Sequence, residues 1–184
     1  MAIAPDAKAK AQWNVLEGTK VAGGMYATST DGQVTGFRAG RLVGDGFQGA
    51  ILIDDPIKPA NAESDVLREH ANTQLAQTVR SRRARPDTPI VCIMQRLHER
   101  DVSGFLLEED IGEPFEHLKI RALDDAGKSY WEIKEPAAQL LSFAAKQPYI
   151  FSGQYQQDPT PEQGRCKASR TGEGSLRGCN SLYG

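Results

Sequence analysis

Two short apolar runs, each followed by polar residues, dominate the pattern of hydrophobic and polar positions along the chain. Residues 50–53 and 89–94 form these runs. A strand without a polar face suits a parallel sheet that is covered by helices on both sides. The polar residues that follow the runs are Asp54 and Asp55 in the first case, and Gln95 and Arg96 in the second. Because ligands of such sheets bind beyond the carboxyl ends of the strands, these residues are the first candidates for chemistry.

The segment between the two runs has the period of a helix. Residues 62–83 contain neither Gly nor Pro, and their apolar residues form one stripe at helical spacing. Asn61 or Ser64 can cap this helix. Strand, helix and strand then make a right-handed βαβ unit, whose two strand ends lie at the same edge of the sheet. The predicted fold is therefore an α/β sheet with three layers.

The remaining segments predict shorter elements on either side of this unit. Residues 1–22 read as a polar lead-in, with a helical turn or two around Ala7 to Leu16. The predicted strands are 25–30 and 33–43, joined by a turn at Asp31-Gly32, and 115–123. The predicted helices are 102–108, one opened by Pro136 and one opened by Pro148. Residues 162–184 have little apolar content and predict a disordered tail.

Composition and charge restrict the class of protein. The apolar content of 39% suffices for a core, and 22 basic against 24 acidic residues give a net charge of −2. Any contact with nucleic acid must therefore come from a local patch. The chain shows no apolar run long enough for a membrane helix and no signal-peptide core. Three cysteines without CxxC spacing favour a reducing compartment, so we expect a cytoplasmic protein.

Each chemical motif has a structural interpretation beside the functional one. In phosphoryl transfer, an aspartate at a strand end holds Mg²⁺ and a neighbouring acid orients the attacking water, which fits Asp54 and Asp55. The same residues with the following proline also make an ordinary turn. The basic run at residues 80–85 is either a solvated helix end or a phosphate contact. His98 is either a ligand or a hydrogen-bonded structural residue at a helix entry.

The 184 residues contain no complete phosphate-binding P-loop pattern. Gly127, Lys128 and Ser129 match its end, but the pattern requires a glycine five positions before Gly127, where the chain has Ala122. The neighbouring Asp124 and Asp125 would also repel a phosphate. We expect this segment to be a turn.

Four sequence blocks carry a resemblance to a known family. They are VTGFRAG at 34–40, ILIDDPIKPANAESDVLRE at 51–69, IVCIMQRLHERDVSGFLLE at 90–108 and YIFSGQYQQDPTP at 149–161. In their order and spacing, over residues 23–164, they resemble the large terminase subunit of tailed bacteriophages. In that family the blocks form the second half of an ATPase domain of the P-loop class, which drives DNA into the procapsid, and a metal-dependent nuclease domain follows. The resemblance implies part of a P-loop NTPase-like, three-layer parallel sheet over residues 23–161.

The resemblance also implies roles for the residues at the strand ends. Asp54 corresponds to the Walker B aspartate that binds Mg²⁺, and Asp55 to the catalytic acid. Gln95 and Arg96 fall on the coupling motif, which senses the γ-phosphate and links hydrolysis to DNA movement. The implied cofactors are ATP and Mg²⁺. The implied partners are double-stranded viral DNA, the small terminase subunit, the portal protein and further copies of the chain in a ring, within the cytoplasm of the bacterial host.

The chain departs from the family pattern in three places. Many members of the wider superfamily have Glu in place of Asp55, and the aspartate side chain is shorter by about 1.5 Å. The Walker A segment expected before residue 1 is absent, as are the nuclease aspartates expected after residue 164. The pattern stops at Gln163-Gly164, as a frameshift or a rearranged prophage gene would produce. We therefore expect this chain by itself to bind ATP weakly or not at all.

Three functions are compatible with these observations. The first is a piece of a terminase ATPase that hydrolyses ATP in its full-length context. The second is a non-catalytic remnant or module that binds DNA or another subunit. The third is a Mg²⁺-dependent nuclease or phosphohydrolase that uses the carboxylates of Asp54, Asp55, Glu99 and Asp101. Dependence on a nucleotide distinguishes the first function from the third.

Overall fold

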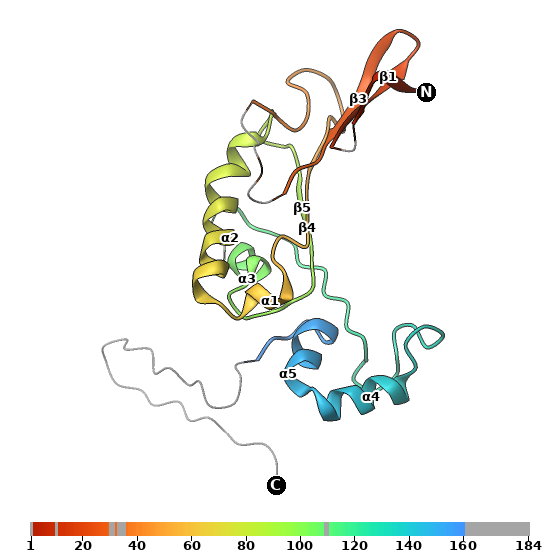
Figure 1. Cartoon of the computed structure of the whole chain (residues 1–184), viewed down its shortest axis with the longest axis vertical. Helices are drawn as coiled ribbons and strands as arrows, with labels where there is room; N and C mark the ends of the chain where they lie inside the picture. Colours follow the sequence, from red (N-terminus) through yellow and green to blue (C-terminus); the bar gives the residue numbers. More distant parts are fainter. Residues whose placement is uncertain (1, 10, 30–31, 33–35, 109–110, 161–184) are drawn as a thin grey trace, which may run out of the picture.

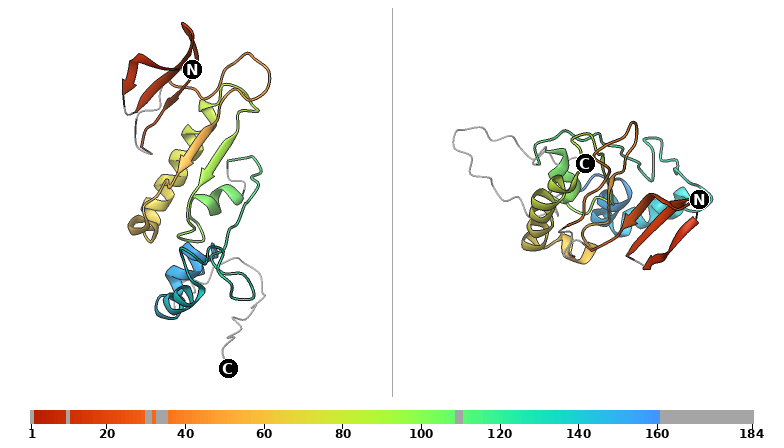
Figure 2. Two further views of the ribbon diagram at one scale, coloured as in Figure 1. Left: turned by 90° about the vertical axis from the view of Figure 1, so that its right-hand side faces the viewer. Right: turned by 90° about the horizontal axis from the view of Figure 1, so that it is seen from above.

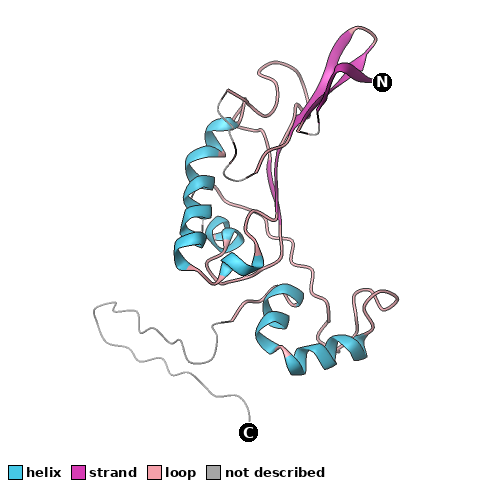
Figure 3. Cartoon of the chain, viewed as in Figure 1, coloured by secondary structure: helices cyan, strands magenta, loops and turns pink. Residues whose placement is uncertain are grey.

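The computed structural model describes residues 2–9, 11–29, 32, 36–108 and 111–160. Its elements, in chain order, are β1 (Ala2–Ala9), β2 (Gln12–Glu17), β3 (Lys20–Tyr26), β4 (Ile51–Asp54), α1 (Pro59–Ala62), α2 (Asp65–Thr78), η1 (Arg80–Arg82), β5 (Ile90–Ile93), α3 (Val102–Leu107), α4 (Ala137–Lys146), α5 (Pro148–Ile150) and η2 (Phe151–Tyr155). Figures 1 and 3 show the sheet β1–β3 at one end, the β4–β5 pair with α2 in the middle, and α4 and α5 at the other end. The tail predicted at 162–184 lies outside the described residues.

The two apolar runs form a parallel pair of strands, as predicted. β4 and β5 pair in register, with Ile51 opposite Ile90 and Asp54 opposite Ile93. Beyond the paired residues, the backbone N–H of Asp55 donates to the carbonyl oxygen of Ile93 at 3.0 Å. Both strands therefore end at one edge of this small sheet, and the polar residues that follow them lie at that edge.

The segment between the strands forms α1, α2 and the short 3₁₀ helix η1 rather than the single helix predicted over 62–83. α1 opens with Pro59, which suits the first turn because the N–H missing from proline would have no partner there. α2 begins after Ser64, whose hydroxyl accepts a hydrogen bond from the N–H of Leu67 at 3.4 Å, so the predicted cap is confirmed. The helix ends at Thr78. Because neither Gly nor Pro lies at the break, the apolar stripe could not reveal it.

Helices α2 and α3 pack on the β4–β5 pair, and Figures 1 and 2 show α2 running alongside the strands. Their apolar side chains form a core together with those of nearby loops. Its buried members are Ile57, Ala62, Ala71, Leu75, Leu97, Val102, Leu106 and Ile111, and Ile53, Cys92 and Met94 of the strand segments pack against them. The core therefore lies on the side of the strands that faces these helices.

The opposite face of the strand pair is open, so the expectation of burial on both faces is wrong for the described residues. Side chains alternate between the two faces of a strand. Leu52, Val91 and Ile93 are 67%, 40% and 60% exposed. The described sheet is a two-layer α/β arrangement, and the three-layer P-loop-like sheet is not seen in it.

Residues 2–26 contain strands instead of the predicted helical turns. β2 pairs antiparallel with β1 on one side and with β3 on the other. A two-residue connection at Gly18 and Thr19 joins β2 to β3, and Gly18 has a φ of +64°, which glycine adopts without steric cost. The Tyr26 ring stacks on the Phe37 ring with centroids 3.8 Å apart. This stack connects the sheet to the loop that leads toward β4.

The predicted strand over 33–43 is absent from residues 36–43, and 33–35 lie outside the described residues. Only Ala39 forms a bridge there, with Arg83. Gly36 and Gly40 have φ values of +89° and +88°, a backbone conformation that interrupts a strand. The strand predicted over 25–30 is also wrong for residues 27–29, because β3 ends at Tyr26, and residue 30 lies outside the described residues.

The strand predicted over 115–123 is wrong as well. Its alternating sequence runs as an irregular segment, and only Leu123 forms a bridge, with Ser129. Leu118 is 84% exposed, so the alternation does not mark a buried face. A strand needs a neighbour that supplies hydrogen bonds, and a sequence pattern does not reveal one.

The C-terminal helices form a second, smaller core. α4 begins after Pro136 and α5 begins at Pro148, and α3 spans Val102–Leu107, so the three predicted helices are confirmed. The buried residues of this core are Leu123, Leu140 and Phe151, with the Phe143 and Tyr155 rings packed against them. No helix among the described residues has the length and hydropathy needed to cross a bilayer.

Candidate functional site

The ends of β4 and β5 border a common hollow of about 160 Å³. Asp55 comes from the end of β4 and Gln95 from the segment after β5, so two of the predicted site residues meet there. The other residues that line the hollow are Ile57, Lys58, Pro59 and Leu97. The parallel pairing of the strands produces this meeting, as expected from the two polar pairs.

Asp54 lies elsewhere at the same edge. It is exposed and does not line the hollow, because neighbouring residues at a strand end point in different directions. Asp55 has a φ of +41°, a left-handed conformation that only a few non-glycine residues adopt. This turn of the backbone, just before Pro56, ends the strand and brings Asp55 to the hollow. The edge therefore carries two carboxylates in different positions.

The donor groups at this edge fit a magnesium ion. The side chains of Asp54, Asp55 and Lys58 form no hydrogen bond or ion pair with the residues that the structure describes. Mg²⁺ is usually held by one or two carboxylates, with water or phosphate oxygens at its remaining positions. Groups of three or more metal-binding side chains are not found in the described ranges. A site of one or two aspartates does not require one.

Arg96 is held in an ion pair and lies outside the lining of the hollow. Its Nε atom lies 3.0 Å from Oδ1 and 3.1 Å from Oδ2 of Asp101, and Nη2 donates to the carbonyl oxygen of Glu99 at 3.1 Å. This agrees with the alternation of side chains along the strand end, which predicts that Arg96 points away from Gln95 or pairs with an acid. The arrangement gives Arg96 a structural role in the loop after β5.

Asp101 is the centre of this loop. Its side chain is fully buried and accepts hydrogen bonds from the backbone N–H groups of Leu97 at 2.8 Å and Gly104 at 2.9 Å. The second of these bonds caps helix α3. With both carboxylate oxygens engaged, Asp101 is not available to a metal ion, which weighs against the carboxylate cluster of a nuclease.

His98 and Cys92 lie close to this edge and have shifted pKa values. Burial, followed by the positive charge of Arg68, lowers the pKa of His98 below its ordinary value, and its Nδ1 accepts a hydrogen bond from the N–H of Arg100 at 3.1 Å. His98 is therefore the hydrogen-bonded structural residue of the two alternatives. Burial, followed by the charges of Asp101 and Asp55, raises the pKa of Cys92 from 9.0 to about 11.

The basic run at residues 80–85 is largely paired with acids. Arg80 and Arg83 both form ion pairs with Glu113, and Arg85 pairs with Asp87. These contacts favour the structural interpretation of the run. They lie at the amino-terminal side of β5, whereas the hollow lies at its carboxyl end.

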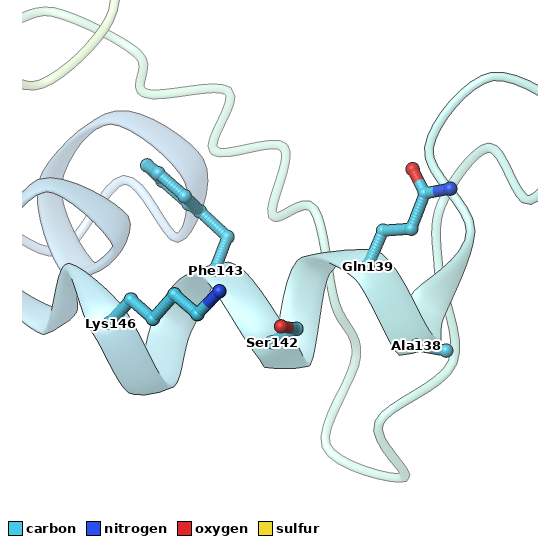
Figure 4. A pocket seen from close by; sticks show the side chains of 5 residues that line it. All are labelled: Ala138, Gln139, Ser142, Phe143 and Lys146. Atoms are coloured by element: carbon cyan, nitrogen blue, oxygen red, sulfur yellow. The ribbon is translucent and has the colours of Figure 1, made fainter.

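A second, shallower hollow of about 370 Å³ lies on α4 and is shown in Figure 4. Its lining residues are Ala138, Gln139, Ser142, Phe143 and Lys146. The Phe143 ring belongs to the aromatic group of the second core, where it lies 5.3 Å from the Tyr155 ring. This hollow contains no carboxylate and none of the residues predicted from the sequence.

Two residues at the first hollow or next to it were not singled out by the sequence patterns. Lys58 lines the hollow and follows the two aspartates within the same sequence block. Gln157 lies 61 positions from Arg96, and its side-chain oxygen accepts the hydrogen bond of the Arg96 N–H at 3.0 Å. An amide-rich segment at 149–157 is visible in the sequence, but its contact with the end of β5 required the structure.

Comparison of the chain with models of known protein families, with curated proteins and with solved structures gave no match.

Proposed function

We propose that the chain is part of the ATPase domain of a phage-type terminase large subunit. In its full-length context this protein hydrolyses ATP to move viral DNA into the procapsid. The observation that carries the proposal is that Asp55 and Gln95, from the ends of two parallel strands, border one hollow. The ordered sequence blocks at 51–69 and 90–108 supply these residues, and their resemblance to the terminase family supports the assignment.

Each residue has a distinct role in this proposal. Asp54 would supply a carboxylate oxygen to Mg²⁺, which when bound would neutralise charge on the phosphoryl group. Asp55 orients the attacking water, and the side-chain amide of Gln95 donates a hydrogen bond to an oxygen of the γ-phosphate across the hollow. Lys58 brings a positive charge to the same hollow and favours an anionic ligand there. Arg96 fixes the loop that presents Gln95.

The proposed partners follow from the same family. They are double-stranded viral DNA, the small terminase subunit, the portal protein and further copies of the chain in a ring. A phosphate-binding lysine and its loop are needed for hydrolysis, and the 184 residues contain no complete pattern for them. We therefore propose weak or no ATP binding for this chain by itself.

A chimera tests this function directly. Residues 49–101 replace the corresponding segment of an active terminase large subunit, which provides the P-loop. We expect the chimera to retain DNA-stimulated ATP hydrolysis. Asp55→Asn should abolish turnover, because the water-orienting carboxylate is lost, and Gln95→Ala should lower kcat with little effect on nucleotide binding.

Asp87→Asn is the matched control within the same segment. Asp87 is exposed, pairs with Arg85 and lies at the opposite end of β5 from the hollow. We expect this variant to hydrolyse ATP at the rate of the unsubstituted chimera. A folded chimera without ATPase activity, or one that is insensitive to Asp55→Asn, would contradict the proposed function.

A further inference from the structure

Residues 153–157 hold the segment after β5, and they have no role in the function proposed above. The side-chain oxygen of Gln157 accepts a hydrogen bond from the N–H of Arg96 at 3.0 Å. This N–H belongs to the peptide group that joins Gln95 to Arg96. Holding the plane of that peptide restricts ψ of Gln95, which is the backbone rotation next to the Gln95 side chain.

The Gln157 side chain is itself fixed at both ends. Its Nε2 atom donates to the carbonyl oxygen of Gln154 at 2.7 Å, so the amide oxygen is directed at Arg96. Its backbone N–H donates to the carbonyl oxygen of Gly153 at 2.9 Å, and its φ of +56° is left-handed. A residue held in such a conformation by its surroundings is a common feature of functional sites.

Gly153 provides a second and independent contact with the same residue. It is buried, and a Cβ atom at this position would lie 2.9 Å from the carbonyl oxygen of Arg96. The backbone of η2 therefore approaches Arg96 as closely as only a glycine permits. One side of Arg96 is held by residues 153–157, and its guanidinium is held by Asp101, the residue that caps α3.

We propose that Gln157 is a positioning residue for the hollow at the ends of β4 and β5. It orients Gln95 toward Asp55 through the Gln95–Arg96 peptide. This inference deepens the proposed function and rests on it for the role of Gln95. Residues 149–157 thereby control the geometry of the hollow without lining it. A displacement of η2 would move Gln95 relative to the two aspartates.

The first measurement is amide hydrogen exchange by NMR on the full chain. In Gln157→Met, which keeps the length of the side chain but removes the acceptor, the Arg96 N–H should exchange about fivefold to tenfold faster, as expected for the loss of one hydrogen bond. Gln157→Glu retains an acceptor oxygen and should restore protection at Arg96. Gln154→Met is the matched control, because only the backbone oxygen of Gln154 takes part in the contact.

The second measurement uses Mn²⁺ alone as a paramagnetic probe of the two aspartates. In the unsubstituted chain, Mn²⁺ should broaden the amide signals of Asp54 and Asp55 and the side-chain amide of Gln95. In Gln157→Met, broadening at the aspartates should persist while broadening at Gln95 falls severalfold, since the effect depends steeply on distance. A purely structural role for Gln157 predicts no such selective change.

The outcomes separate the inference from the proposed function. Unchanged exchange of the Arg96 N–H in Gln157→Met overturns the positioning role, whether or not Mn²⁺ binds. Faster exchange with unchanged broadening at Gln95 overturns it as well, because the peptide is then freed without moving Gln95. An absence of broadening at Asp54 and Asp55 in the unsubstituted chain instead contradicts the metal-binding part of the proposed function.

Discussion

The Nε atom of Arg96 lies 3.0 Å from Oδ1 of Asp101, whose side chain is fully buried. Removing one partner of such a pair leaves a buried charge without compensation. Asp101→Ala also leaves the N–H groups of Leu97 and Gly104 without their acceptor. We expect the free energy of unfolding, measured by urea denaturation, to fall by about 3–5 kcal/mol.

Asp87→Ala is the control for this prediction. Asp87 is also paired with an arginine, but its side chain is 65% exposed. An exposed ion pair contributes at most about 1 kcal/mol, so the loss should be much smaller. Equal losses in the two variants would show that burial of Asp101 does not determine the stability of the loop after β5.

The left-handed conformation of Asp55 predicts that function and stability conflict at this position. Its φ of +41° is accessible to glycine without steric cost. Asp55→Gly should therefore leave the chain equally stable or stabilise it by up to about 1 kcal/mol, while the carboxylate is lost. Thermal denaturation measures the stability, and the ATPase chimera measures the loss of turnover. A clear decrease in the melting temperature would mean that the Asp55 side chain stabilises the turn itself.

The raised pKa of Cys92 predicts low reactivity toward alkylating reagents. The thiolate is the reactive form, and a pKa of about 11 instead of 9.0 reduces its fraction near pH 8 by about 100-fold. The rate of iodoacetamide labelling at Cys92, followed by mass spectrometry, should rise about tenfold per pH unit until the pH approaches 11, instead of levelling off near 9.0. Asp55→Asn should increase the rate, because the charge of Asp55 contributes to the raised pKa. A rate equal to that of a free cysteine peptide would contradict the burial of the thiol.

The open face of the β4–β5 pair predicts unusual tolerance of polar substitutions in two apolar strands. Leu52 and Ile93 are 67% and 60% exposed, so Leu52→Thr with Ile93→Thr should change the free energy of unfolding by less than about 1 kcal/mol. Urea denaturation of the double variant measures this. Ile53→Thr, on the face that packs against α2, should cost more. A large loss in the double variant would indicate that a further layer covers the strands.

Sequence patterns predicted the elements that depend on residues close together in the chain. They were wrong where a distant segment determines the structure. The βαβ unit followed from two apolar runs and a helical stripe, because each pattern corresponds to one buried face. The same runs predicted burial on both faces. The sequence does not distinguish an apolar residue that is covered from one, such as Leu52, that is exposed. The alternation at 115–123 was equally ambiguous, because a strand also requires a neighbour.

The same distinction holds for the residues of the candidate site. Asp54, Asp55 and Gln95 were predicted to converge because parallel strands end at one edge, and only Asp55 and Gln95 line the hollow. Arg96 was expected to point away from Gln95, and its partner proved to be Asp101, five positions along the chain. Gln157 could not be predicted, since its hydrogen bond to Arg96 spans 61 positions and depends on how the C-terminal helices pack. A pattern of neighbouring residues contains no information about such a contact.

The sheet β1–β3 has a consequence for how the molecule unfolds. The contacts that join its described residues to the following loop include the stack of Tyr26 on Phe37 and a hydrogen bond from Arg41 to the carbonyl oxygen of Val21 at 3.2 Å. The side chains that the structure describes in β2 and β3 belong to neither of the two cores. Cooperative unfolding depends on shared buried contacts, so we expect this sheet to open independently of the βαβ unit. We expect it to open and close many times within the lifetime of one folded βαβ unit.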